Sequence, residues 1–374
     1  MMTTKPIGLY VHIPFCIRKC NYCDFASFNC SRISWREEYI DALCGEILTY
    51  KGRKISVDSI FFGGGTPSLL TPLEFEKIMS AIRETFVIST STEFTVEANP
   101  KTLNKEKLDA FIKCGVNRLS IGLQSIHENE MKTLGRIHNF DDFLVSYNLA
   151  RECGIENINV DLMYAIPEQT MVSFEKTLSK VCDLSPEHIS LYGLILEEGT
   201  DFYNNRESLN FPGEDSECDM YYFACEYLKK RGYSHYEISN YAKNGYECQH
   251  NLKYWQSEEY IGVGLAAYSY FEGKRFGRGK NPEEYIKKNY TQYEYAEEID
   301  DSERKYEFVM LGLRLSEGFS LSDYKARFGE DFIDSHKEIV DKHIFLGNIL
   351  LIDDSLKLTE QGFYISNTII NELI

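Results

Sequence analysis

The chain has 374 residues, of which 43% are hydrophobic and 26% are charged, and its formal net charge is −18. A chain of this length and composition can bury a sizeable core and hold one large domain with a smaller companion. The strong acidity disfavours general binding to nucleic-acid backbones, because such binding needs a basic surface that displaces counterions.

The start of the chain, "MMTTKPIGLYVHIPF", holds only a short apolar run, and no segment reaches the roughly 18 apolar residues that span a bilayer. We therefore expect a cytoplasmic protein without a signal peptide or transmembrane segment, while peripheral membrane contact stays open. Eleven cysteines are present, and those outside one N-terminal group are isolated. In a reducing compartment this pattern indicates buried free thiols and not a disulfide framework.

Six short apolar segments in the first half of the chain are predicted to be β-strands: "GLYVHIP", "SIFFGGGTPS", "EFTVEANP", "RLSIGLQS", "NINVDLMYAIP" and "HISLYGLIL". Between them lie amphipathic stretches long enough for helices, at residues 35–49, 73–85, 105–114, 140–153 and 171–183. This alternation predicts parallel strands joined by right-handed helical crossovers. The expected fold class is therefore α/β, with a partial (βα)6 barrel of the TIM type that is open at one side.

The remainder of the chain has a looser pattern. A helix with a Pro-Gly entry is predicted within 211–233, and 233–280 is rich in Tyr, Gly and short strand-like pieces. From about residue 301, helices are predicted at 303–315, 320–328 and 332–345, followed by the hairpin "ILLIDDSLKLT" and a last helix from residue 360. This order resembles a winged-helix module, but residues 300–374 carry fifteen acidic and eight basic side chains, which disfavours DNA binding.

Three regions follow from these patterns. We expect a partial barrel in residues 1–210, a connecting and substrate-covering region in 211–300, and a C-terminal helical, winged-helix-like domain in 301–374.

The stretch "HIPFCIRKCNYCDF" places Cys16, Cys20 and Cys23 directly after the first predicted strand. Three thiolate ligands suit zinc or an iron–sulfur cluster. A structural zinc site needs four ligands, and the nearest residues that could supply the fourth are His12 and Cys30. A 4Fe–4S cluster held by three cysteines leaves one iron free for an exogenous ligand. Accidental grouping of core cysteines and a zinc knuckle are the alternative interpretations.

The Cys-x3-Cys-x2-Cys spacing after an N-terminal strand resembles that of the radical S-adenosylmethionine (SAM) enzymes. The resemblance implies a radical SAM barrel and a 4Fe–4S cluster whose unique iron is chelated by the amino and carboxylate groups of SAM. Electron transfer from the cluster then breaks the sulfonium of SAM into methionine and a 5′-deoxyadenosyl radical.

A cofactor held at the barrel mouth needs polar groups where successive strands end. "FFGGGTPS" ends the second strand with three glycines, which let a ligand approach the backbone closely. Single polar residues close the next three strands, and each of them alone could be an ordinary capped or surface residue. A buried aspartate is costly without a partner, which favours a site at the fifth strand. The residues in question are Gly63, Gly64, Gly65, Glu97, Gln124 and Asp161.

The family resemblance assigns roles to these residues. It places the glycine turn at the methionine end of SAM, assigns Glu97 to the ribose, and puts Gln124, Asp161 and Arg136 near SAM. It also places Tyr10 beside the cluster. Phe25 and Thr66 complete the expected cofactor-binding residues.

Within this family, the whole chain resembles the group of oxygen-independent coproporphyrinogen III oxidases and HemW-type haem chaperones. The resemblance is carried by "YVHIPFC", "FFGGGTPS", "EANP", "DLMYAIPEQT" and the C-terminal helical module. Oxidases of this group have a further cysteine two positions after the third and a longer N-terminal extension, whereas this chain has Phe25 at that position. "QHNLKYWQ" contains the HNxxYW pattern of the chaperones.

Haem needs aromatic and aliphatic walls and an axial His, Cys, Met or Tyr ligand. His250 of the HNxxYW pattern meets that need and is the first haem-ligand candidate. The alternative, which is the more common case for such a histidine, is an ordinary packed, hydrogen-bonded side chain. Tyr268 stands where relatives usually have a histidine, and tyrosine can ligate ferric haem, so Tyr268 is the second candidate.

The resemblance therefore implies a haem chaperone that carries a 4Fe–4S cluster and SAM and delivers haem to acceptor proteins, expected to be respiratory ones, with an electron donor as a further partner. A radical SAM enzyme acting on a tetrapyrrole, either the oxidase or a haem methyltransferase, is one alternative. A zinc-stapled binding module is another. Turnover of SAM stays open, and coproporphyrinogen oxidase activity is not expected.

Overall fold

Seven neighbouring parallel strands form the centre of the structure, which is a computed structural model that describes residues 5–32, 34–287 and 292–374. Six of them follow the chain in spatial order, and all six predicted strands are confirmed. They are β1 (Ile7–Ile13), β4 (Ser56–Gly64), β5 (Val87–Ala98), β6 (Arg118–Gln124), β7 (Asn157–Tyr164) and β8 (His188–Gly193). The seventh, β11 (Tyr260–Val263), pairs with β1 and was not assigned from the sequence. Residues 1–4, part of the start interpreted as lacking a signal peptide, lie outside the described residues.

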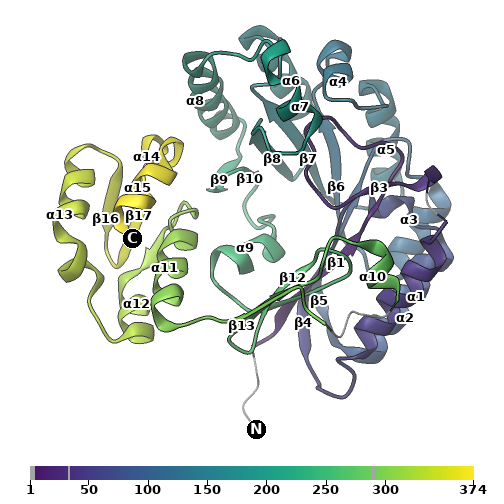
Figure 1. The fold of residues 1–374 in the computed structure, drawn as a ribbon. Coiled ribbons are helices and arrows are strands. Elements are labelled where there is room, and N and C mark those ends of the chain that lie inside the picture. Colours follow the sequence, from purple (N-terminus) through teal and green to yellow (C-terminus); the bar gives the residue numbers. More distant parts are fainter. Residues whose placement is uncertain (1–4, 33, 288–291) are drawn as a thin grey trace.

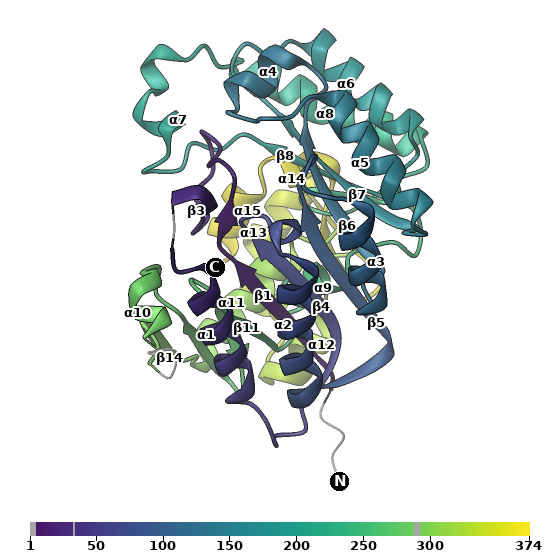
Figure 2. The ribbon, with the colours of Figure 1, turned by 90° about the vertical axis from the view of Figure 1, so that its right-hand side faces the viewer.

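Helices cover the outer face of this curved sheet, as the sequence predicts (Figure 1). Three of them begin at a capping box, in which the side chains of Thr71, Asn139 and Thr170 accept a hydrogen bond from the first helical turn. Figure 2 shows the row of outer helices from the side. The row consists of α1 (Arg36–Leu48), α2 (Pro72–Thr85), α3 (Lys105–Lys113), α5 (Phe140–Glu152) and α6 (Met171–Asp183), and a short helix that was not predicted, α4 (Glu128–Thr133), follows β6.

Residues 211–300 contribute strands to both edges of the same sheet. β10 (Asn240–Ala242) and β9 (Ser234–Glu237) extend it beyond β8, while β12 (Tyr268–Phe271), β13 (Lys274–Gly277) and β14 (Tyr295–Glu298) extend it beyond β11. These strands have three or four residues each, which is too short for an alternating pattern to assign them. The region also holds α8 (Glu214–Lys230), the helix predicted after the Pro-Gly entry, together with α9 (Gln249–Trp255) and α10 (Pro282–Ile286); α7 (Asp201–Asn204) precedes it.

The C-terminal residues form a helical module with a small sheet, in line with the winged-helix-like expectation (Figure 1). Ser320 caps a helix as predicted, since its hydroxyl accepts a hydrogen bond from the Asp323 N–H at 2.9 Å. The predicted hairpin turns at Asp353 and Asp354. The elements are α11 (Asp301–Gly312), β15 (Phe319–Ser320), α12 (Leu321–Phe328), α13 (Phe332–Phe345), β16 (Ile349–Ile352), β17 (Ser355–Leu358), α14 (Glu360–Tyr364) and α15 (Ser366–Leu373).

Over the described residues, no helix combines the length and the apolar character needed to cross a membrane.

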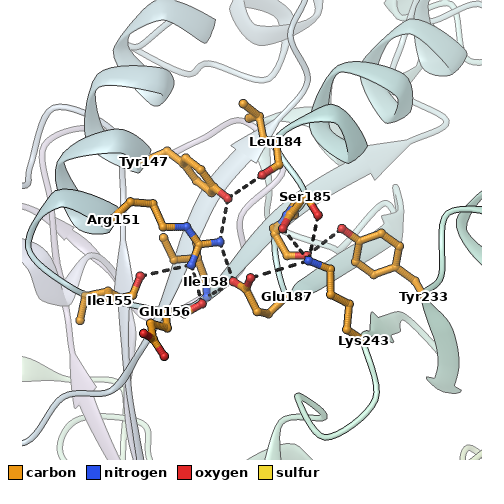
Figure 3. Close-up of polar contacts among 11 residues, drawn as sticks. Tyr147, Arg151, Ile155, Glu156, Ile158, Leu184, Ser185, Glu187, Tyr233 and Lys243 are labelled. Carbon is orange, nitrogen blue, oxygen red and sulfur yellow. Dashed lines mark hydrogen bonds and ion pairs between the residues drawn. The ribbon is translucent and has the colours of Figure 1, made fainter.

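An ion-pair network fixes the end of the barrel where β7 and β8 begin (Figure 3). The Arg151 guanidinium on α5 donates to the Tyr147 hydroxyl at 2.8 Å, to the Ile155 carbonyl at 3.2 Å and to the Glu187 carboxylate at 2.6 Å. Lys243 donates to the Ser185 carbonyl at 2.7 Å and lies 3.7 Å from the same carboxylate. One planar guanidinium thus ties α5 to the loops that precede two barrel strands.

Replacing Arg151 by lysine should lower the free energy of unfolding by about 1–2 kcal/mol, because lysine keeps the charge but cannot reach several acceptors at once with a planar fork. Urea unfolding followed by circular dichroism measures the change. Arg53→Lys is the matched control, since Arg53 makes an exposed ion pair with Glu272, and such pairs contribute little. Equal effects of the two substitutions would contradict the structural role of the network.

Candidate functional site

A cavity of about 460 Å³ opens at the carboxyl ends of the parallel strands. Its wall includes residues that end or follow β4, β5, β6, β7 and β8, among them Gly64, Glu97, Gln124 and Gly193. This edge is where barrels of this kind place their ligands. All three cysteines of the N-terminal group also line it.

The cysteine loop is held over this cavity by backbone hydrogen bonds. Two short strands, β2 (Phe15–Cys16) and β3 (Phe28–Asn29), pair in parallel at its base, where the Phe28 N–H donates to the Pro14 carbonyl at 2.7 Å. Asn21, between the second and third cysteines, donates its N–H to the Leu134 carbonyl at 3.0 Å and accepts from the Phe202 N–H at 2.9 Å. The loop is thereby anchored to segments that follow β6 and β8.

Polar groups surround two of the thiols. The Thr66 hydroxyl lies 3.7 Å from Cys16 Sγ, and the Arg136 guanidinium donates to Cys20 Sγ at 3.4 Å. Burial raises the pKa of the Cys16 thiol and raises that of Cys23 to about 11. Both thiols are therefore protonated at neutral pH unless a bound cation displaces the protons.

Neither residue considered as a fourth protein ligand is among the described residues that line the cavity. The two ring nitrogens of His12 lie 2.8 Å from the Ala26 carbonyl and 3.1 Å from the Tyr10 hydroxyl, and burial lowers its pKa to about 4. Cys30 lies beyond β3, at the start of a short 3-10 helix. Of the residues considered as ligands, the three cysteines Cys16, Cys20 and Cys23 are therefore the ones that face the cavity.

The three thiols on the cavity wall are a donor set that a 4Fe–4S cluster can use. Within residues 5–32, 34–287 and 292–374, no three His, Cys, Asp or Glu side chains converge closely enough to hold a metal ion. Zinc needs its ligands to converge on one point, whereas a cluster binds each cysteine through a different iron, so the thiolates stay apart. Cys16, Cys20 and Cys23, which share one cavity wall, are compatible with the second requirement.

Arg136 connects the cysteine loop to the barrel strands. Its Nη2 donates to the Asn99 side-chain oxygen at 2.8 Å and to the Gly122 carbonyl at 2.6 Å. A side chain at Gly122 would collide with this guanidinium, since a Cβ there would lie 2.6 Å from Nη2. The buried Nε of Arg136 has no hydrogen-bond partner in the described part of the chain, which leaves a donor for a ligand.

The glycine turn after β4 forms a wall without side chains. Gly64 has a φ of +105°, and a Cβ at this position would lie 2.4 Å from the His12 ring. A Cβ at Gly65 would lie 2.7 Å from the Phe15 carbonyl oxygen. Only glycine fits both positions, so a ligand can meet the backbone directly here.

Two partly buried carboxyl groups face the cavity from β5 and β7. Glu97 accepts a hydrogen bond from the Gly64 N–H at 3.2 Å, and burial, with the neighbouring charge of Asp161, raises the pKa of Glu97 to about 8. Asp161 accepts from the Asn159 amide at 2.7 Å and from the Ser120 hydroxyl at 3.2 Å, and burial raises its pKa as well. Both groups can bind the hydroxyl or ammonium groups of a polar ligand.

The structure thus brings together most of the predicted site residues. Those that line the cavity are Cys16, Cys20, Cys23, Phe25, Gly64, Gly65, Thr66, Glu97, Gln124, Arg136 and Asp161. Tyr10 and Gly63 are not among the described lining residues but adjoin each other behind the wall, since a Cβ at Gly63 would lie 3.0 Å from the Tyr10 ring. Gln124 has a φ of +73°, an uncommon conformation outside glycine.

The two predicted haem ligands lie elsewhere. His250 is buried, with Nδ1 2.9 Å from the Ser59 hydroxyl and Nε2 2.8 Å from the Tyr254 hydroxyl, and burial lowers its pKa to about 3. Both ring nitrogens are therefore engaged, and iron ligation would require one of these bonds to break. Tyr268 is half exposed on β12, with its ring centroid 6.4 Å from that of Tyr295.

Several cavity residues were not found from the sequence. Asn99, which orients Arg136, stands two residues after Glu97 in "EANP" and could have been found there. The others lie in or beside segments already described, such as Tyr22 between Cys20 and Cys23, but their residue types alone do not indicate a ligand. They are Tyr22, Ser120, His138, Met163, Tyr192 and Ile195.

Exposed apolar side chains ring the cavity mouth. Ile195 is 71% exposed and Phe25 is 58% exposed, and three further residues of the lining, Ile17, Ile137 and Tyr192, are also exposed. Large apolar groups gathered at a concave surface are typical of a binding site.

The matched families agree with this geometry. The Radical SAM superfamily model matches residues 10–181, and the HemN C-terminal domain model matches residues 299–365.

Relatives that match over nearly their full length identify the family within this superfamily. The chain is 35% identical to "Heme chaperone HemW" of Lactococcus lactis, over 100% of this chain and 98% of the relative, and 32% identical to "Heme chaperone HemW" of Escherichia coli, over 99% and 98%. Coproporphyrinogen III oxidase (HemN) from Escherichia coli, a solved structure, has a TM-score of 0.86 over 98% of this chain and 90% of that chain. At 23% identity, that match establishes the fold alone. The chain therefore belongs to the radical SAM superfamily and, within it, to the HemW family.

Proposed function

We propose that this protein is a haem chaperone that binds haem, carries a 4Fe–4S cluster and SAM, and delivers haem to acceptor proteins, respiratory ones in particular. The observation that carries this proposal is the similarity over the full chain length to proteins named haem chaperones. The likeness to the oxidase is limited to the fold, and Phe25 stands where that enzyme group has its further cysteine.

The cavity lined by the three cysteines, called the cofactor cavity below, has residues suited to each part of this cofactor pair. Cys16, Cys20 and Cys23 would hold the cluster, with Arg136 beside the second thiolate. The backbone of the glycine turn would meet the methionine end of SAM, and Glu97 would accept hydrogen bonds from the ribose. When bound, the cluster and SAM supply one-electron chemistry.

A radical SAM enzyme that acts on a tetrapyrrole is the second candidate. The apolar mouth of the cavity favours it, because a large flat substrate could dock there above the thiols. This candidate is tested by reducing the protein anaerobically in the presence of SAM and either coproporphyrinogen III or haem. Formation of protoporphyrinogen or of a methylated, opened ring would show an enzyme and contradict the chaperone proposal. Recovery of unchanged tetrapyrrole would support the chaperone proposal.

Haem titration of the anaerobically purified protein tests the leading proposal. We expect saturable uptake of haem, seen as a shifted absorption band, followed by transfer of that haem to a haem-free acceptor protein. Absence of saturable uptake would overturn the proposal. Titration of His250→Gln in parallel tests the sequence-based ligand candidate, since an unchanged ferric haem spectrum would remove His250 as a ligand.

A further inference from the structure

A second cavity, of about 340 Å³, lies at the seam between the barrel and the C-terminal module, and is called the seam cavity below. Figure 1 shows α9 and β13 on one side of this seam and α11 and α12 on the other. The cavity is separate from the cofactor cavity, and the two share no described lining residue. Its volume is within the range of pockets that take small organic ligands.

Aromatic and aliphatic side chains from both parts form the walls of this seam cavity. Tyr254, Tyr260 and Tyr270 line the barrel side, and Tyr260 and Tyr270 are paired across β11 and β12. The edge of Tyr254 packs against Tyr260 at 4.5 Å between ring centroids. The C-terminal module contributes Phe308, Met310, Leu311 and Phe328. Such walls suit a flat, largely apolar ligand.

The charges of the seam cavity leave two arginines available for anions. Its acidic residues already have close cationic partners, because Glu258 lies 3.0 Å from Lys253 and Glu307 lies 2.5 Å from Arg275. Arg304 and Arg327 instead pair with exposed aspartates on their own helices, Asp301 at 3.3 Å and Asp323 at 2.9 Å. Such exposed pairs are weak, so a ligand carboxylate can replace either aspartate.

Arg327 is also held in place by an aromatic side chain. Its guanidinium carbon lies 4.9 Å from the centroid of the Phe308 ring, which itself lines the cavity. The Arg304 and Arg327 side chains are 50% and 43% exposed, so they stand at the mouth of the cavity with their charges reachable from solvent. The cavity therefore has aromatic and aliphatic walls, two acidic residues that are already paired, and two further cations at its mouth. This combination is complementary to a flat molecule with carboxylates on one edge.

We propose that the haem bound by this protein occupies the seam cavity, with its two propionates on Arg304 and Arg327 and its iron facing Tyr270. This assignment rests on the proposed haem-binding function and names the site for it. Tyr270 lines the cavity, and its hydroxyl has no hydrogen-bond partner within the described residues. A phenol is an axial ligand type for haem iron. The cofactor cavity then remains free for the cluster and SAM.

Titration of the full-length, anaerobically purified protein with haem and with metal-free protoporphyrin tests the assignment. The double variant Arg304→Gln/Arg327→Gln should bind both compounds at least about tenfold more weakly, because both carry the propionates. Tyr270→Phe should shift the absorption spectrum of bound ferric haem while leaving protoporphyrin affinity unchanged. Arg206→Gln is the matched control, since Arg206 stacks 4.6 Å over Tyr203 and lines neither cavity.

The outcomes separate the two proposals. If the unaltered protein takes up no haem, the proposed function fails. If it takes up haem and the double arginine variant binds as tightly as Arg206→Gln, the seam assignment alone is overturned. Thermal unfolding of each variant checks that weakened binding comes with an intact fold. If the double arginine variant is unstable, Tyr270→Phe decides, since a changed spectrum of bound ferric haem supports the seam assignment and an unchanged spectrum overturns it.

Discussion

Anaerobically purified protein should lose its iron–sulfur absorption and nearly all of its iron when Cys23 is replaced by serine. The unaltered chain should carry about four iron atoms, as a 4Fe–4S cluster requires. Cys23 faces the cofactor cavity together with Cys16 and Cys20. Removing one of only three protein ligands leaves two irons of the cluster without a side-chain ligand, so the cluster should not survive purification. Iron analysis and visible absorption measure the loss.

Cys30→Ser is the matched control, because Cys30 is the nearest other cysteine in the chain and is not among the described residues that line the cavity. It should retain the full iron content. Equal loss of iron in both variants would mean that four cysteines hold the cluster, and SAM could then no longer complete its coordination. Zinc in place of iron in the unaltered protein would restore the zinc-knuckle interpretation.

The sequence predicted the barrel well because its signals are local. Each of the six strands is an apolar run long enough to recognise, and the helices between them begin at capping residues such as Thr71 and Asn139. The edge strands could not be assigned in the same way. β9 to β14 have at most four residues each, and their pairing with β8 and β1 is set by tertiary packing.

The cofactor cavity could be predicted only where a motif marks a strand end. Glu97 near the end of β5 and Asp161 within β7 were found because a carboxylate stands out in an apolar strand. Tyr192 near the end of β8 and Ile195 just after it were missed, because apolar and aromatic residues in a predicted strand do not by themselves indicate a site. For His250, in contrast, a motif indicated a ligand role, but the structure engages both ring nitrogens in hydrogen bonds. A histidine in a distinctive motif indicates a ligand, but the buried hydrogen bonds to Ser59 and Tyr254 depend on where α9 packs, which the sequence does not reveal.

Ionisation of Glu97 should make the cluster-free, SAM-free protein less stable as the pH rises from about 5 to about 9. Burial and the charge of Asp161 raise the pKa of Glu97 to about 8 in the folded chain, from 4.5 in the unfolded chain. Between these two values the folded chain binds the extra proton, so its stability falls with rising pH and the loss is complete above pH 8. A carboxyl whose pKa is raised this far lowers the free energy of unfolding by an amount on the order of 2–4 kcal/mol over this pH range.

Urea unfolding at pH 5, 7 and 9 measures this dependence as a difference between the unaltered protein and Glu97→Gln. Glutamine is close to the protonated carboxyl in shape and does not ionise, so the variant should match the unaltered protein at pH 5 and exceed its stability at pH 9. Groups whose pKa does not depend on Glu97, such as Glu237 with its pKa raised to about 7, change the stability of both proteins alike and cancel in the difference. Asp24→Asn, on an exposed carboxylate at the same cavity, is the control for the altered net charge. A parallel pH dependence of Glu97→Gln and the unaltered protein would show that Glu97 has an ordinary pKa, and the cavity would then lack the protonated carboxyl assigned to the ribose.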